Sequence, residues 1–89
     1  MDYKAYFIEL LIQFLNGVLS REEVARQVAV TMPIDTNYVD DEKLMNNCEW
    51  ALRHINEPDH YSTEGELSYY LSCLRGETEY SQEERDNSM

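Results

Sequence analysis

Four stretches of the sequence carry apolar residues at helical spacing, and this pattern constrains the fold more than any other feature. Spacings of three and four residues place such side chains on one face of an α-helix. A glycine or a proline interrupts the pattern after each stretch, at Gly17, Pro33, Pro58 and Gly76. No alternating run between glycine turns suggests a β-hairpin, and no repeat of fixed period is present. The pattern therefore predicts an all-α fold.

The first two predicted helices cover residues 2–16 and residues 20–32. The first is apolar on most of its sides, which indicates a central helix that its neighbours contact from several directions. The second begins at a capping box, with Ser20 as the cap and Glu23 reaching back to it. Because only residues 17–19 connect the two helices, we expect them to form an antiparallel hairpin.

The next two predicted helices cover residues 41–56 and a stretch from Thr63 to the C-cap at Gly76. Thr63 and Glu66 form a second predicted capping box. Residues 1–76 are therefore expected to fold as one domain, a small antiparallel four-helix bundle. Residues 77–89 are charged and lack apolar periodicity, so they are expected to form a flexible acidic tail with room for one short turn around residues 81–85.

The acidic charge is concentrated in the later part of the chain. Eighteen acidic and seven basic residues give a net charge of −11, and fourteen of the acids but only four of the bases lie in residues 35–89. A phosphate backbone would be repelled, which argues against nucleic-acid binding, and an anionic membrane is disfavoured for the same reason. The charge favours capture of a positively charged partner. The alternative is an acidic surface that serves solubility alone.

Residues that could carry catalysis or bind a metal do not occur at suitable spacings. His54 and His60 are six residues apart across a proline, and Cys48 and Cys73 have no C-x-x-C spacing. The run Asp40-Asp41-Glu42 fits an N-cap and an acidic first turn better than a calcium loop. We therefore expect no enzyme activity, no cofactor, no metal and no disulfide framework.

The apolar run near the N-terminus is too short and too polar for a membrane span or a signal peptide. Glu9, Gln13 and Asn16 interrupt it. The expected location is the cytoplasm.

The most informative surface feature is a set of aromatic residues among acids. At about 100° per residue, Trp50 and Tyr69 lie opposite the apolar stripes of their helices. Large side chains of this kind anchor protein interfaces when charged residues surround them. The alternative is that a further helix or the tail covers them. The predicted partner-binding residues are Asp35, Tyr38, Asp40, Asp41, Glu42, Glu49, Trp50, Asp59, Tyr61, Glu64 and Tyr69.

Short segments of the chain resemble one family. They are the pair Phe14-Leu15 at the end of the first helix, Leu19-Ser20 with Glu22-Glu23 at the start of the second, and residues 59–64 before the last helix. In these segments, and in its small size and acidity, the chain is similar to the helical bacterial toxin-immunity proteins of the colicin D type and of contact-dependent growth inhibition. No residue role is carried over, because that family has no single inhibitory motif.

The resemblance implies a toxin domain as the partner, with a nuclease, such as one that cleaves transfer RNA, as the leading class. An acidic protein would cover the basic cleft of such a nuclease and exclude its substrate. The alternatives are an acidic adaptor or regulatory subunit, a phage-type inhibitor that mimics nucleic acid, and a small structural or stress protein.

Overall fold

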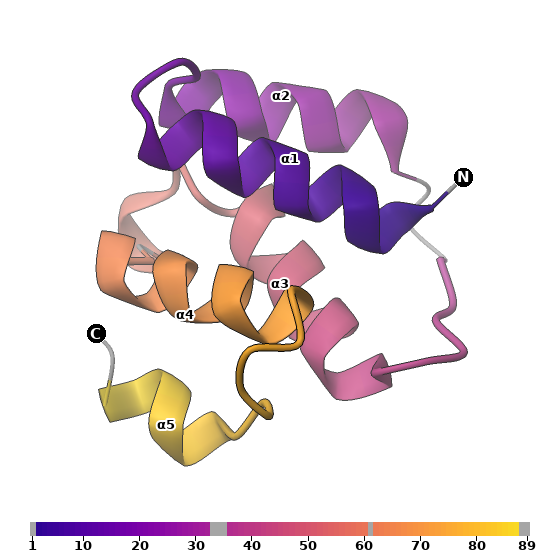
Figure 1. Cartoon of the computed structure of the whole chain (residues 1–89). Helices are drawn as coiled ribbons and strands as arrows, with labels where there is room; N and C mark the ends of the chain where they lie inside the picture. The colour runs from indigo at the N-terminus through magenta and orange to yellow at the C-terminus, as the bar shows by residue number, and fades with distance from the viewer. Residues whose placement is uncertain (1, 33–35, 61, 88–89) are drawn as a thin grey trace.

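The computed structural model describes residues 2–32, 36–60 and 62–87 (Figure 1). Throughout these residues the regular secondary structure is helical, so the predicted all-α class is confirmed. The elements in chain order are α1 (Tyr3–Leu15), α2 (Arg21–Thr31), α3 (Glu42–Arg53), the 3-10 turn η1 (Pro58–His60), α4 (Glu64–Leu74) and α5 (Gln82–Asn87).

Local caps set where the helices begin. Both hydrogen bonds of the capping box between Ser20 and Glu23 are present at the start of α2. At the start of α4, Thr63 Oγ1 accepts a hydrogen bond from the Glu66 amide at 3.1 Å. The Glu66 carboxylate does not complete the predicted second box and instead lies 3.9 Å from Arg85 Nε. The first capping box is therefore confirmed in full and the second by one hydrogen bond.

Helix α1 packs against three other helices. It runs antiparallel to α2, and it also contacts α3 and α4 (Figure 1). Phe7, Leu10 and Leu11 are buried on one side, while Ile8 and Ile12 are half-buried against the same core. This agrees with the expectation, from its apolar residues on most sides, that the first helix is contacted from several directions.

The core is continuous across the first four helices. Helix α2 packs mainly on α3, and α1 packs mainly on α4. In Figure 1, α3 runs obliquely beneath the α1–α2 pair, and a fifth helix packs on α4. The antiparallel four-helix bundle is therefore not confirmed. The fully buried side chains of the core include Phe7, Leu11, Val24, Val28, Cys48, Leu52, Ile55 and Leu67.

The segment after Gly76 packs on the domain, so the predicted flexible tail is not confirmed. The Tyr80 ring stacks on the Tyr70 ring, with 5.9 Å between centroids and an interplanar angle of 14°. The Asn47 amide donates to the Tyr80 hydroxyl at 2.8 Å. The Ser81 amide donates to the Tyr69 hydroxyl at 2.9 Å. Periodicity missed this contact because Tyr80 is a single aromatic residue followed by charged ones.

Each described helix is too short or too polar to cross a membrane.

Candidate protein-binding surface

Several basic side chains are half-buried and make hydrogen bonds within the fold. Arg21 donates to the carbonyl oxygens of Ile55 and Ser62 at 3.0 and 2.9 Å. Arg53 donates to the carbonyl oxygen of Met32 at 3.0 Å. These two guanidinium groups satisfy backbone carbonyls between elements, which would otherwise lose their hydrogen bonds with water on burial.

Glu49 and Tyr38 form part of the same internal network. Arg53 Nε donates to Glu49 Oε2 at 2.8 Å, and the Tyr38 hydroxyl donates to Glu49 Oε1. The Glu49 side chain is only 13% exposed. Burial and the hydrogen bond to Glu49 raise the pKa of Tyr38 well above its usual value. Glu49 is a predicted partner-binding residue, but it is not on the open surface, because Arg53 and Tyr38 cover it.

Arg85 is also turned toward the protein. Its Nη1 lies 3.4 Å from the Tyr70 hydroxyl, and its Nε lies 3.9 Å from Glu66 Oε1. Glu66 is only 7% exposed, and burial raises its pKa although Arg85 opposes the rise.

Acidic residues therefore outnumber basic ones by a larger ratio on the surface than in the whole sequence. Fifteen of the seventeen acidic residues that the structure describes are exposed, against three of the seven basic ones. Of those three, Arg26 pairs with Glu22 at 2.8 Å, and Arg75 lies 4.0 Å from Glu77. A cationic partner would meet carboxylates over most of this surface.

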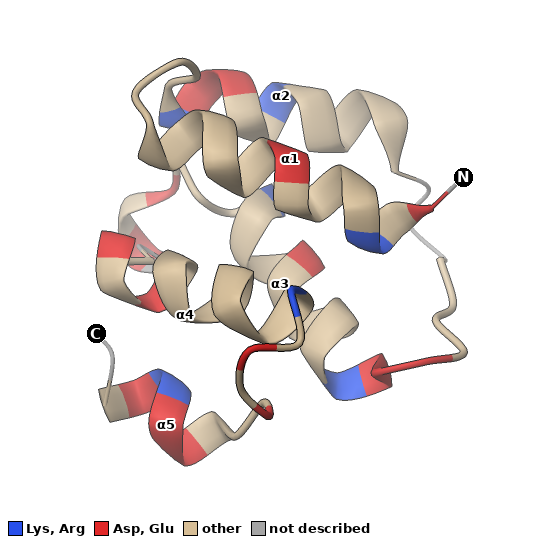
Figure 2. Cartoon of the chain, viewed as in Figure 1, with Lys and Arg blue, Asp and Glu red and all other residues tan. Residues whose placement is uncertain are grey.

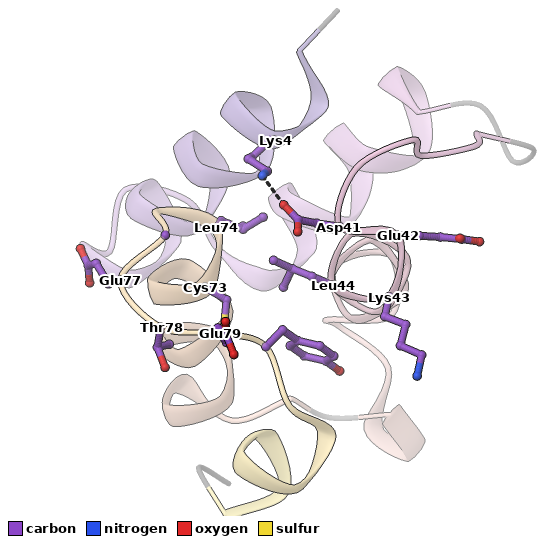
Figure 3. A pocket seen from close by; sticks show the side chains of 12 residues that line it. Lys4, Asp41, Glu42, Lys43, Leu44, Cys73, Leu74, Glu77, Thr78 and Glu79 are labelled. Carbon is purple, nitrogen blue, oxygen red and sulfur yellow. Dashed lines mark hydrogen bonds and ion pairs between the residues drawn. The ribbon is translucent and has the colours of Figure 1, made fainter.

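Two hollows meet at an ion pair between distant parts of the chain. Lys4 Nζ of α1 lies 2.6 Å from Asp41 Oδ2 at the start of α3, and the two residues are 37 positions apart (Figure 3). Lys4 lines both hollows. We call the surface formed by the two hollows and this pair the Lys4–Asp41 face.

The larger hollow has a volume of about 780 Å³ and an apolar floor. Leu44 comes from α3, Leu74 from the end of α4, and Tyr80 from the connection to α5. In Figure 3 the side chains of Leu44 and Leu74 point toward the centre of the hollow, while Glu42 and Glu77 point away from its opposite ends. An apolar floor with charged ends suits an amphipathic ligand.

The smaller hollow, of about 480 Å³, lies between α1 and the connection to α3. Tyr38 forms one wall, where its ring packs edge-on against the Tyr3 ring at 6.1 Å between centroids. Val39 also lines it and is 96% exposed. An apolar side chain so exposed has its area available for contact with a partner.

Asp41 adopts an unusual backbone conformation at the centre of the face. It occupies the N-cap position of α3 with φ 53°, in the left-handed region. Aspartate tolerates this region better than most residues. Its side chain makes no capping hydrogen bond and pairs with Lys4 instead. The expected N-cap position is therefore confirmed, while the carboxylate serves the ion pair.

The charge of the Lys4–Asp41 face is negative. Acidic segments lie at the start of α3 and in the α4–α5 connection (Figure 2). Besides Lys4 and Lys43, the charged residues that line the two hollows are Asp2, Asp40, Asp41, Glu42, Glu77 and Glu79. Six carboxylates against two ammonium groups favour a cationic ligand.

The structure brings together only some of the predicted partner-binding residues. Tyr38, Asp40, Asp41 and Glu42 line the Lys4–Asp41 face. Asp59 and Glu64 are exposed but line neither hollow. Asp35 and Tyr61 lie outside the described residues.

The two predicted aromatic anchors, Trp50 and Tyr69, differ in how exposed they are. Trp50 is 49% exposed on the outer side of α3, and its ring centroid lies 4.7 Å from that of His54. His54 Nδ1 is 2.6 Å from Glu57 Oε2. Tyr69 is half-buried, and its hydroxyl accepts a hydrogen bond from the Ser81 amide, so it is not an exposed anchor and the alternative that the tail covers it agrees with the structure. The residues after Gly76 cover it.

Sequence reasoning missed several residues of the face. Glu77 and Glu79 lie in a segment without apolar periodicity, which predicts a flexible tail, whereas Tyr80 of the same segment is expected to extend the candidate surface. The sequence indicates Asp2 only as the N-cap of the first helix and Lys4 only as part of its first turn. No local signal links Lys4 to Asp41.

Within the described part of the chain, no three or more His, Cys, Asp or Glu side chains are grouped to hold a metal ion. Comparison with known proteins finds no matching family model, no matching curated protein and no matching solved structure.

Proposed function

We propose that this chain is an immunity-type protein that binds and neutralises a basic toxin domain in the cytoplasm, and that the toxin is a nuclease, such as one that cleaves transfer RNA. The observation that carries the proposal is the division of charge. Arg21, Arg53 and Arg85 are held inside the fold, while fifteen acidic side chains are exposed.

A nuclease must bind a polyanion, and its cleft is therefore cationic. Carboxylates on the surface of this chain can occupy the positions of phosphate groups and speed association over long distances. Exposed ion pairs alone contribute only about 0–1 kcal/mol each, so a stable complex also needs apolar contact. Val39, which is 96% exposed, supplies apolar area on the same face as the carboxylates.

A second candidate is an acidic adaptor with two binding surfaces. The exposed Trp50 favours it, because this residue lines neither hollow and so offers a separate aromatic anchor. A nucleic-acid mimic is less well supported. Such a mimic would space its carboxylates along one long face, whereas here many lie at helix ends and in the connections between helices (Figure 2).

The test begins with affinity capture of partners from the native host, followed by purification of the captured protein. The proposal expects a basic protein with nuclease activity, and titration with this chain should abolish RNA cleavage at one-to-one stoichiometry. Binding measured by calorimetry should weaken as sodium chloride is added, because screening reduces the attraction. Unchanged cleavage in a saturated complex would contradict neutralisation, and a captured basic protein without nuclease activity would favour the adaptor.

A further inference from the structure

We infer that the Lys4–Asp41 face receives a short basic segment of the partner, with an apolar side chain in the larger hollow and an arginine or lysine that takes the place of Lys4 on Asp41. The inference rests on the proposed function for the source of the segment, and it adds the chemistry that the face recognises.

The larger hollow suits one apolar side chain and its neighbouring backbone. Its volume of about 780 Å³ lies within the range of roughly 300–1,000 Å³ that holds drug-sized ligands. Leu44 and Leu74 line it and are almost fully covered, so their exposed atoms form a floor and not a protruding patch. Filling such a floor with an aliphatic side chain removes apolar area from water on both molecules.

A cation of the partner can replace Lys4 on Asp41 with little loss of free energy of folding. The two side chains are 38% and 53% exposed, and solvent screening leaves such a pair little net stability. The flexible lysine stem can swing into solvent, where its ammonium group is well hydrated. An incoming guanidinium could bind the Asp41 carboxylate through two parallel hydrogen bonds, which a lysine does not form.

The surrounding charges select the occupant. Asp40 lies on the side of the smaller hollow, and Glu42 and Glu79 lie on the side of the larger one. A segment with cations on both sides of its apolar residue meets a carboxylate at each end. A second copy of this chain is a poor occupant, because two molecules of net charge −11 repel each other.

The experiment titrates the isotopically labelled full chain with a synthetic peptide in which arginines flank a central leucine, and follows backbone amide shifts by NMR. We expect the largest shifts at residues 38–44 and 73–80. A matched peptide with serine in place of leucine should bind several-fold more weakly, because the hollow is then left unfilled.

Variants distinguish specific binding of the peptide at Asp41 from its attraction to the net negative charge of the protein. Asp41→Asn combined with Glu79→Gln should weaken peptide binding roughly tenfold. Glu9→Gln combined with Glu22→Gln removes equal charge outside both hollows and should change it less than about twofold. Lys4→Met should strengthen binding more than Lys43→Met does, because only Lys4 competes for Asp41. Circular dichroism checks that each variant is folded, and asparagine tolerates the left-handed conformation of residue 41.

Three results would overturn the inference: amide shifts centred on Trp50 and His54, equal effects of Lys4→Met and Lys43→Met, or equal affinity for the leucine and serine peptides. None of them bears on inhibition of a nuclease by the wild-type chain. Conversely, a nuclease left active in its complex would contradict the proposed function even if the peptide binds as expected.

Discussion

Arg21 shows at the scale of one residue how this chain uses its few cations. Its guanidinium bonds to the carbonyl oxygens of Ile55 and Ser62 and lies 5.2 Å from the centre of the Phe14 ring. One side chain of α2 thereby joins the end of α1, the end of α3 and the approach to α4. The sequence shows only an arginine inside a capping box, and its role depends on where those carbonyls lie.

Replacement of Arg21 by methionine should destabilise the fold by about 3 kcal/mol, because two buried carbonyl groups lose their donors. Urea denaturation followed by circular dichroism measures the change. Arg26→Met is the matched control, since Arg26 is exposed on the same helix and pairs only with Glu22 among the bonds described. The control should change stability by less than about 0.5 kcal/mol. Equal effects would show that the Arg21 hydrogen bonds contribute little.

Glu66 should make stability depend on pH. Burial raises its pKa above the usual 4.5, and Arg85 only partly offsets the rise. The folded state therefore holds this proton more tightly than the unfolded state. The contribution of protonated Glu66 to the free energy of unfolding is fully present at low pH. It is lost as the pH rises from about 4.5 through the pKa of the folded state.

Glu66→Gln should remove this pH dependence. Relative to the wild type, the variant should gain stability as pH rises from about 4.5 toward neutrality. Urea denaturation at a series of pH values measures both proteins under the same conditions. Parallel curves over this range would mean that the carboxyl group is not desolvated in the folded state.

At the scale of elements, the packed segment after Gly76 is the main departure from the sequence-based expectation. It adds an aromatic stack on Tyr70, hydrogen bonds to Asn47 of α3 and Tyr69 of α4, and the short helix α5, which packs on α4. It also forms one wall of the larger hollow, through Glu77, Glu79 and Tyr80. The proposed binding surface is therefore incomplete without a segment that looks like a solvated tail in the sequence.

Removal of residues 77–89 should lower stability by about 2–3 kcal/mol, because the aromatic stack and the hydrogen bonds to Tyr69 and Asn47 are lost. Thermal denaturation measures this effect, and the truncated chain should keep the helical circular dichroism of α1 to α4. Tyr80→Phe is the control, since it keeps the ring but removes the hydroxyl group, and should cost about 1 kcal/mol. An unchanged melting temperature after truncation would show that the segment is not docked in solution.

At the scale of the whole molecule, the net charge acts over the full width of the protein. The molecule measures 28 × 27 × 24 Å. The Debye length is about 30 Å at 0.01 M salt and about 8 Å at 0.15 M. At low salt every carboxylate is therefore repelled by nearly all the others, whereas at the higher salt only neighbours interact.

Addition of sodium chloride over this range should raise the melting temperature by several degrees at neutral pH, because screening relieves the repulsion within the folded state. The same salt should weaken binding to a basic partner, so the two effects have opposite signs. The control is the same experiment near pH 4.3, the isoelectric point calculated from the sequence, where the net charge is close to zero. A salt effect as large there would contradict an electrostatic origin.

Local sequence patterns are enough to predict the helical class, the start of α2 at its capping box and the glycines Gly17 and Gly76 that follow the ends of α1 and α4. These features depend on interactions within about four residues of the chain, which a single sequence displays. The acidity of the later half was equally plain. Four of the predicted partner-binding residues do line the Lys4–Asp41 face, because they share one loop and one helix start.

Which charges remain on the surface depends on how the helices pack against one another. Glu49 is covered where Tyr38 packs against it from the connection before α3, Glu66 is covered where Arg85 of α5 approaches it, and Lys4 meets Asp41 from 37 positions away. Such contacts depend on how packed helices are placed relative to one another. Local propensity and helical periodicity carry no information about that placement, so neither the covered carboxylates nor the two hollows could be read from the chain alone.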